Sequence, residues 1–148
     1  MNPVKLCTIG FTKTNAEGFF ERLQKAGVRT VIDVRLHNTS QLAAFAKADD
    51  LAYFLNKIGD IKYIHQPLFA PTDSMLKAFK KEKSEWSTYE NHFLALMAER
   101  QIEKRIAPGS LEGACLLCSE ATPHHCHRRL VCEYLNEHWG GPLQITHL

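Results

Sequence analysis

Residues 30–34 read T-V-I-D-V, a β-branched and mostly apolar run. Such a run is typical of a strand that is buried on both faces of a parallel sheet. A second apolar run, V-K-L-C-T-I at residues 4–9, precedes it. Between the two runs, Phe19, Leu23 and Ala26 recur at helical spacing. Strand, helix and strand within about 30 residues form a βαβ unit, which indicates an α/β fold.

The same alternation continues to the end of the chain. Further strands are predicted at residues 62–65, 114–118 and 143–147, and stretches of helical periodicity separate them. We therefore predict a single α/β domain over residues 1–148 with three layers. Its sheet has roughly five mainly parallel strands, with helices on both faces. The order of the strands does not follow from the sequence.

The composition is that of an ordinary globular protein. The 148 residues are 45% hydrophobic and 23% charged, and the net charge of +2 is too small to indicate a nucleic-acid or membrane surface. We expect no signal peptide and no membrane span, because no apolar run is long enough for either. Five cysteines without paired spacing fit free thiols in a reducing compartment. We therefore expect a cytoplasmic protein with no cofactor and no membrane partner.

Polar or small residues follow each predicted strand. The carboxyl ends of parallel strands lie along one edge of the sheet, where ligands bind and helix N-termini point. We therefore predict a shared cleft at this edge. The residues concerned include Thr12, Asp33, Arg35, His65, Cys118, Ser119, Glu120, Thr146 and His147.

The densest group of such residues lies in residues 116–131, which read L-L-C-S-E-A-T-P-H-H-C-H-R-R-L-V. Thr122 and Pro123 suit the first positions of a helix. The N–H groups and the dipole at a helix start favour an anion. Cys126 and His127 are each followed by apolar residues at four-residue spacing, which predicts that both face the sheet.

These residues suggest catalytic chemistry, and a structural alternative stays open for each. Cys126 near a helix start, or Cys118 at a strand end, is a candidate nucleophile. In the same interpretation His127 assists catalysis. The structural alternative is that Cys126 is a small buried hydrophobic residue and His127 a hydrogen-bonded histidine of the core. Glu120 and Asp33 are the candidate general acid and base. The structural alternative for Glu120 is capping of a helix dipole.

A second set of side chains is predicted to bind an anionic substrate: Arg35, Arg128, Thr12 and His65. Arg35 can clamp a phosphate or carboxylate with two hydrogen bonds. Alternatively, it forms a local ion pair with Asp33, which projects to the same side of an extended segment. Arg128 has two candidate partners, the Glu120 carboxylate and an external anion.

We expect no bound metal. Cys115 and Cys118 have a spacing seen in zinc sites, but side chains alternate along a strand, so these two thiols point to opposite faces. The ligand set that then remains is Cys118, His124, Cys126 and His127.

Four short motifs are similar to those of one known family. They are T-I-G at residues 8–10, D-V-R at 33–35, C-S-E at 118–120 and C-H-R at 126–128. In this order the chain resembles the domain-of-unknown-function family numbered 488. The resemblance implies a small cytosolic domain of prokaryotic type and no established reaction. It carries over as motif positions Asp33, Arg35, Cys118, Glu120, Cys126, His127 and Arg128.

The chain departs from this family pattern after D-V-R. Many similar sequences continue with a proline and a Ser-Arg pair, whereas this chain reads L-H-N-T-S-Q-L, with Gln41 after Ser40. One expected cation is therefore missing. The resemblance thus points to a divergent subgroup whose ligand carries less negative charge.

Together, these observations predict an enzyme that acts on a phosphate-bearing small molecule, a nucleotide or a nucleic-acid end at the C-terminal edge of the sheet. The expected partner is an anionic small molecule or nucleotide, with nucleic acid as a second candidate. One alternative is a non-catalytic module that binds a nucleotide or nucleic acid through the same cleft. Another is a structural or interaction domain whose motif ties a helix to the sheet.

Overall fold

A five-stranded sheet forms the centre of the computed structural model, which describes residues 3–38, 44–80, 85–120 and 124–148. All strand pairs are parallel, and their order is β3-β2-β4-β1-β5. This sheet confirms the predicted α/β fold and places the carboxyl ends of its strands along one edge. The strands are β1 (Val4–Gly10), β2 (Thr30–Asp33), β3 (Lys62–His65), β4 (Ala114–Cys118) and β5 (Leu143–His147).

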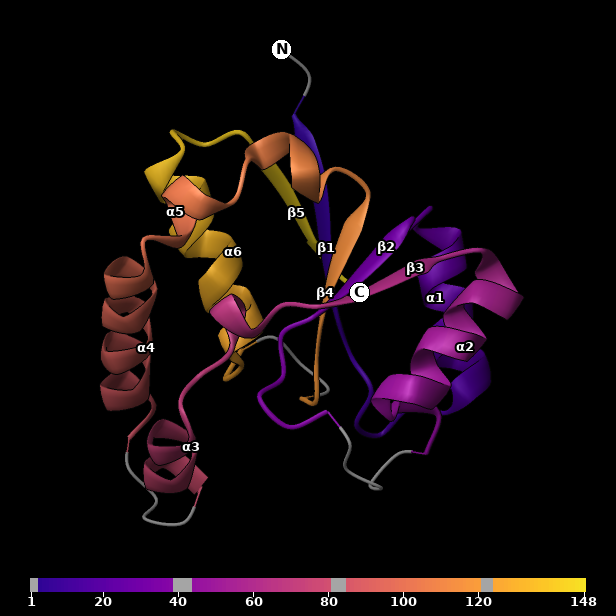
Figure 1. The fold of residues 1–148 in the computed structure, drawn as a ribbon, viewed down its shortest axis with the longest axis horizontal. Coiled ribbons are helices and arrows are strands. Elements are labelled where there is room, and N and C mark those ends of the chain that lie inside the picture. The colour runs from indigo at the N-terminus through magenta and orange to yellow at the C-terminus, as the bar shows by residue number, and fades with distance from the viewer. Residues whose placement is uncertain (1–2, 39–43, 81–84, 121–123) are drawn as a thin grey trace.

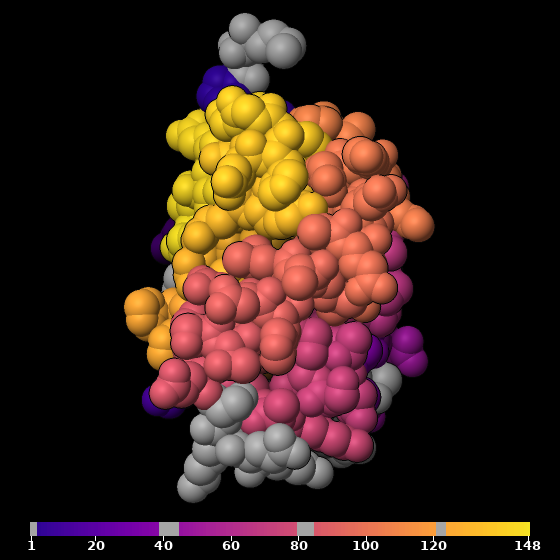
Figure 2. Space-filling model, turned by 90° about the vertical axis from the view of Figure 1, so that its left-hand side faces the viewer, coloured from indigo at the N-terminus to yellow at the C-terminus, as the bar shows by residue number. Residues whose placement is uncertain are grey.

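Helices cover both faces of the sheet and complete the three layers (Figure 1). Helices α1 and α2 lie on one face, and α3 to α6 lie on the other. Figure 2 shows the second face, on which α4 and α6 pack side by side. The helices are α1 (Ala16–Lys25), α2 (Ala48–Gly59), α3 (Asp73–Lys80), α4 (Trp86–Arg100), α5 (Ile102–Arg105) and α6 (His127–His138), with 3₁₀ turns at Ala44–Ala46, Pro67–Phe69 and Pro108–Leu111. None of the described helices is long and apolar enough to cross a membrane.

Strand β4 lies in the middle of the sheet, and its side chains divide the core in two. All five of its residues are buried. Ala114, Leu116 and Cys118 belong to the core beneath α4 and α6. Cys115 and Leu117 belong to the core beneath α1 and α2. The alternation predicted to separate Cys115 from Cys118 is therefore confirmed.

Helix α6 begins later than the sequence suggests. Its first residue is His127, and Cys126 is the N-cap with an extended backbone. The predicted start at Thr122 and Pro123 lies outside the described residues. Because the helix begins here, Cys126 and His127 sit together at its N-terminus, against the carboxyl end of β4.

Candidate active site

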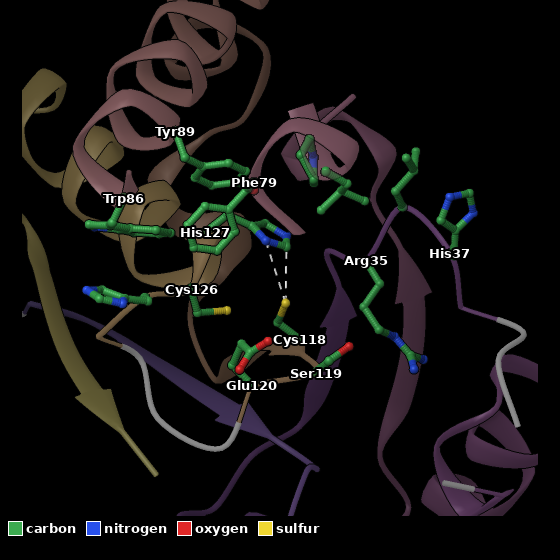
Figure 3. A pocket seen from close by; sticks show the side chains of 14 residues that line it. Arg35, His37, Phe79, Trp86, Tyr89, Cys118, Ser119, Glu120, Cys126 and His127 are labelled. Atoms are coloured by element: carbon green, nitrogen blue, oxygen red, sulfur yellow. Dashed lines mark hydrogen bonds between the residues drawn. The ribbon is translucent and has the colours of Figure 1, made fainter. Parts of the chain in front are cut away.

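A pocket of about 100 Å³ opens at the carboxyl edge of the sheet (Figure 3). It lies between the end of β4, the segment after β2, helices α3 and α4, and the start of α6. Six of its lining residues are apolar or aromatic: Leu36, Pro71, Leu76, Phe79, Trp86 and Tyr89. Polar and reactive groups line the remainder: Arg35, His37, Cys118, Ser119, Glu120, His125, Cys126 and His127.

Three reactive side chains of this pocket point toward one another (Figure 3). The Sγ atom of Cys118 lies 3.6 Å from Nδ1 of His127. The sulfur of Cys126 joins them, and the ligand atoms of all three residues lie within 4.8 Å of one another. The exposed fractions of Cys118, Cys126 and His127 are only 6%, 2% and 7%. We call Cys118, Cys126 and His127 the Cys-Cys-His cluster.

The orientation of the His127 ring is set by a main-chain group. Nε2 of His127 lies 2.8 Å from the carbonyl oxygen of Val34, in the segment after β2. Because a carbonyl oxygen only accepts hydrogen bonds, Nε2 carries a hydrogen and donates it. In the neutral ring the acceptor is then Nδ1, which lies 3.6 Å from Cys118 Sγ, while Nε2 lies 3.8 Å from it. A base that is oriented in this way by a third group is the arrangement found beside activated nucleophiles.

The pKa values of the two cysteines of the cluster are shifted in opposite directions. The Cys126 thiol donates a hydrogen bond to Cys118, and this lowers the pKa of Cys118 against the opposing effect of burial. The N–H groups of Ser119 and Glu120 and the charge of Arg128 lower the Cys118 pKa further. The same hydrogen bond, together with burial, raises the pKa of Cys126 well above its ordinary value. Of the two thiols left open by the sequence, Cys118 is therefore the one that ionises first.

Arg128 lies beneath the pocket rather than in its lining. Its side chain is 0% exposed. Nε donates to the Thr8 hydroxyl at 3.2 Å, and Nη1 donates to the main-chain carbonyl of Glu120 at 2.7 Å. The contact with Glu120 therefore uses its carbonyl and not its carboxylate, the partner that the sequence suggested. Arg128 thus holds the segment after β4 and supplies positive charge near Cys118, while its role toward an external anion stays a prediction.

Asp33 and Arg35 form the local ion pair that the sequence offered as an alternative. Nε and Nη2 of Arg35 donate to the two Asp33 carboxylate oxygens at 2.9 and 2.8 Å, and Nη2 also donates to the Ala46 carbonyl at 2.7 Å. The Tyr63 hydroxyl donates to Asp33 at 2.6 Å. The Arg35 guanidinium points away from the Cys-Cys-His cluster (Figure 3). Both charges are therefore engaged in holding the segment after β2.

Some of the predicted site residues line this pocket and others do not. The lining contains Arg35, Cys118, Glu120, Cys126 and His127, and the Glu120 side chain is exposed. Outside its lining, Thr12 is exposed, and His65 makes a 2.9 Å hydrogen bond from Nε2 to the Arg35 carbonyl. Asp33 and Arg128 are buried behind the pocket.

Sequence analysis missed the aromatic wall of the pocket. Trp86, the first residue of α4, stacks between Tyr89 at 5.1 Å and His125 at 4.9 Å. Phe79 of α3 lies 5.1 Å from Tyr89. Because α3 and α4 reach the end of β4 only through tertiary packing, no local sequence signal connects these rings with Cys118.

Gly10, the last residue of β1, allows the segment after β4 to approach closely. A Cβ atom at this position would overlap the Glu120 carbonyl oxygen and lie 3.0 Å from Nη1 of Arg128. We expect Gly10→Ala to lower the free energy of unfolding by about 1–3 kcal/mol, because the overlap displaces this segment. Urea denaturation followed by tryptophan fluorescence measures the change. Gly109→Ala is the control, since a Cβ there meets nothing within 4 Å, and an equal loss in both variants would contradict the prediction.

The Cys-Cys-His cluster is also the group of side chains that could hold a metal ion within the described part of the chain. His124, a ligand considered from the sequence, does not belong to it. Its exposed ring stacks on His125 with 4.5 Å between the ring centroids.

Comparison with known proteins gives one match. The family model described as "Domain of unknown function DUF488" matches residues 15–135. This range contains the D-V-R, C-S-E and C-H-R motifs, whereas T-I-G precedes it. No curated protein and no solved structure matches the chain.

Proposed function

The chain belongs to the DUF488 family, whose description names no activity, and we propose from the geometry of the pocket that it is an enzyme with Cys118 as nucleophile and His127 as base. The observation that carries this proposal is the 3.6 Å contact between Cys118 Sγ and His127 Nδ1 at the pocket. Nucleophile, base and orienting group come from β4, from α6 and from the Val34 carbonyl. Their mutual placement is the arrangement required for covalent catalysis.

The pocket wall favours a substrate with an apolar part and an electrophilic acyl carbon. His127 Nδ1 takes the proton of the Cys118 thiol, and the resulting thiolate attacks that carbon and forms a carbon–sulfur bond. The bond from the carbon to the leaving group breaks, and the leaving group departs with the proton from His127. Water, deprotonated by His127, then attacks the thioester and releases the acid and the Cys118 thiol. A phosphate, which the sequence favoured, is the less preferred reacting group. Arg35 donates to Asp33 and to the Ala46 carbonyl, and Nε and Nη1 of the fully buried Arg128 donate within the protein, which leaves only its Nη2 without a hydrogen-bond partner among the described residues.

Selective alkylation of the metal-free protein tests the nucleophile. Cys7 is the internal reference, because it is more exposed than Cys118 but burial raises its pKa. We expect limiting iodoacetamide to modify Cys118 before Cys7 and before the buried cysteines, as read by peptide mass spectrometry. His127→Asn should slow the reaction at Cys118 by about 100-fold, the lower end of what a positioned base contributes.

His125→Asn is the matched control, since His125 lines the same pocket but lies outside the Cys-Cys-His cluster. This variant should keep the wild-type rate at Cys118. Preferential alkylation of Cys7, or equal rates in both histidine variants, would contradict the proposal. A panel of activated acyl esters, thioesters and phosphate esters then tests turnover. Hydrolysis of an acyl substrate that Cys118→Ser abolishes supports the proposed reaction, whereas hydrolysis of phosphate esters alone restores the phosphate prediction.

A further inference from the structure

In the proposed reaction Cys126 serves only as a hydrogen-bond donor to Cys118. It is 2% exposed, and its sulfur lies with Cys118 and His127 in the Cys-Cys-His cluster. A hydrogen-bond donor to Cys118 does not need to be sulfur, since a serine hydroxyl would serve. Two sulfur atoms and one imidazole nitrogen around a common point are, however, a typical ligand set for zinc.

We infer that Cys118, Cys126 and His127 bind one zinc(II) ion whose fourth coordination position faces the pocket. We further infer that this zinc masks the Cys118 thiolate, so that metal occupancy regulates the enzyme. The second statement rests on the proposed function, whereas the binding of zinc does not.

The donor atoms of the cluster lie close enough together for one ion. In a tetrahedral site with zinc–sulfur bonds of about 2.3 Å and zinc–nitrogen bonds of about 2.0–2.1 Å, sulfur and nitrogen lie about 3.5 Å apart. Cys118 Sγ lies 3.6 Å from Nδ1 but also 3.8 Å from Nε2 of His127, so the sulfur has to move toward the Nδ1 side of the ring for both atoms to bind one ion. Thiolate and imidazole donors favour zinc over magnesium or calcium, which take oxygen ligands.

The surroundings of His127 fit a metal ligand as well. A histidine that binds zinc through one ring nitrogen usually donates the other N–H to a carbonyl or carboxylate. His127 donates from Nε2 to the Val34 carbonyl at 2.8 Å, which leaves Nδ1, 3.6 Å from Cys118 Sγ, as the ring nitrogen for the metal. Because Nε2 is occupied by this hydrogen bond, Nδ1 is the ring nitrogen that takes a proton in the metal-free protein and that would bind zinc in the metal-bound one.

Cys115 belongs to the opposite core, as the sequence predicted. Of the ligands that the sequence left possible, Cys118, Cys126 and His127 come together where the start of α6 meets the end of β4, and His124 does not join them. A zinc site with two cysteines, one histidine and an open fourth position is of the kind that exchanges an external ligand.

Zinc binding is tested on protein first freed of metal with a chelator. Native mass spectrometry with added zinc chloride should show one zinc per chain. Cobalt(II) in its place should give a sulfur-to-cobalt charge-transfer band and the intense visible bands of tetrahedral cobalt. X-ray absorption of the zinc form should show sulfur at about 2.3 Å together with nitrogen or oxygen at about 2.0–2.1 Å. The absence of a stoichiometric ion, or a shell without sulfur, would overturn the inference.

The variant Cys126→Ser removes one proposed zinc ligand while it keeps the Cys118 thiol. Serine keeps a donor for Cys118 but is a poor zinc ligand, so zinc affinity should fall by more than the 10- to 100-fold typical of changes around the ligands. Cys7→Ser and His124→Ala, which remove groups outside the cluster, should bind zinc as the wild type does. Unchanged affinity in Cys126→Ser would refute the assignment. If that variant does not fold by circular dichroism, the X-ray absorption of the wild type decides instead.

Regulation is tested by alkylation with and without zinc. Zinc should protect Cys118 from iodoacetamide in the wild type, whereas in Cys126→Ser the rate at Cys118 should be the same with and without zinc. Alkylation at an equal rate with and without bound zinc would overturn the masking. A reactive Cys118 without stoichiometric zinc binding would leave the proposed function standing and remove the metal. Stoichiometric zinc binding together with an unreactive Cys118 in the metal-free protein would keep the zinc site and overturn the proposed function.

Discussion

Asp33→Asn is expected to lower the free energy of unfolding by about 3–5 kcal/mol, because it breaks a buried ion pair from one side. The exposed fractions of Arg35 and Asp33 are 4% and 0%, and their shortest contact is 2.8 Å. Asparagine keeps the size of the side chain but leaves the Arg35 guanidinium without its counter-charge. Urea denaturation measures the loss.

Two comparisons isolate the cause of this loss. Asp73→Asn breaks an ion pair with Lys77 whose two side chains are 56% and 59% exposed, and we expect little change there. Arg35→Met combined with Asp33→Asn should cost less than Asp33→Asn alone, since no unpaired buried charge remains. A loss in Asp33→Asn no larger than that in Asp73→Asn would show that the buried pair contributes little.

Arg128→Met is expected to lower the free energy of unfolding by about 2–4 kcal/mol, since it removes hydrogen bonds from a charged, fully buried group. The Glu120 carbonyl and the Thr8 hydroxyl each lose a donor. The reactivity of Cys118 should fall as well, because Arg128 is one of the groups that lower the Cys118 pKa. Denaturation and alkylation measure the two effects separately.

Arg129→Met is the control for Arg128→Met. The Arg129 side chain is 22% exposed and pairs with Glu90 and Glu133, so its loss should cost at most about 1 kcal/mol. Melting with and without phosphate tests the prediction of an external anion. One outcome would favour an external anion over the internal contacts as the role of Arg128. In it, phosphate stabilises only the wild type, and without phosphate Arg128→Met is as stable as Arg129→Met.

The parts of the fold that depend on local pattern were predictable from the sequence. Residues 114–118 form an uninterrupted apolar run, and such a run forms a buried strand wherever it lies in a sheet. The convergence of Cys118 with the segment after β2 follows from the rule that parallel strands end at one edge. The position of β4 between β1 and β2 was not predictable, because it depends on hydrogen bonding between segments far apart in the chain.

Within the site, the residue types were predictable but their directions were not. Arg35 was open to two interpretations because an extended segment places Asp33 and Arg35 on the same side whether or not a ligand is present. The carbonyls of Ala46 and Val34 decide what Arg35 and His127 do. Such main-chain acceptors leave no trace in side-chain patterns. The distances within the Cys-Cys-His cluster were not predictable for a similar reason, since they depend on the start of α6 lying against the end of β4.

The central place of β4 also determines when the candidate active site can assemble during synthesis. The neighbours of β4 in the sheet, β1 and β2, are translated long before it and share no edge with each other. A growing chain can pair β2 with β3, but β1 has no partner until β4 emerges and β5 follows. Cys118, Cys126 and His127 all lie in this late part of the chain, and the carbonyl that orients His127 belongs to an early one. The reactivity proposed for Cys118 therefore depends on a site that is complete only once the sheet has closed around its last strands.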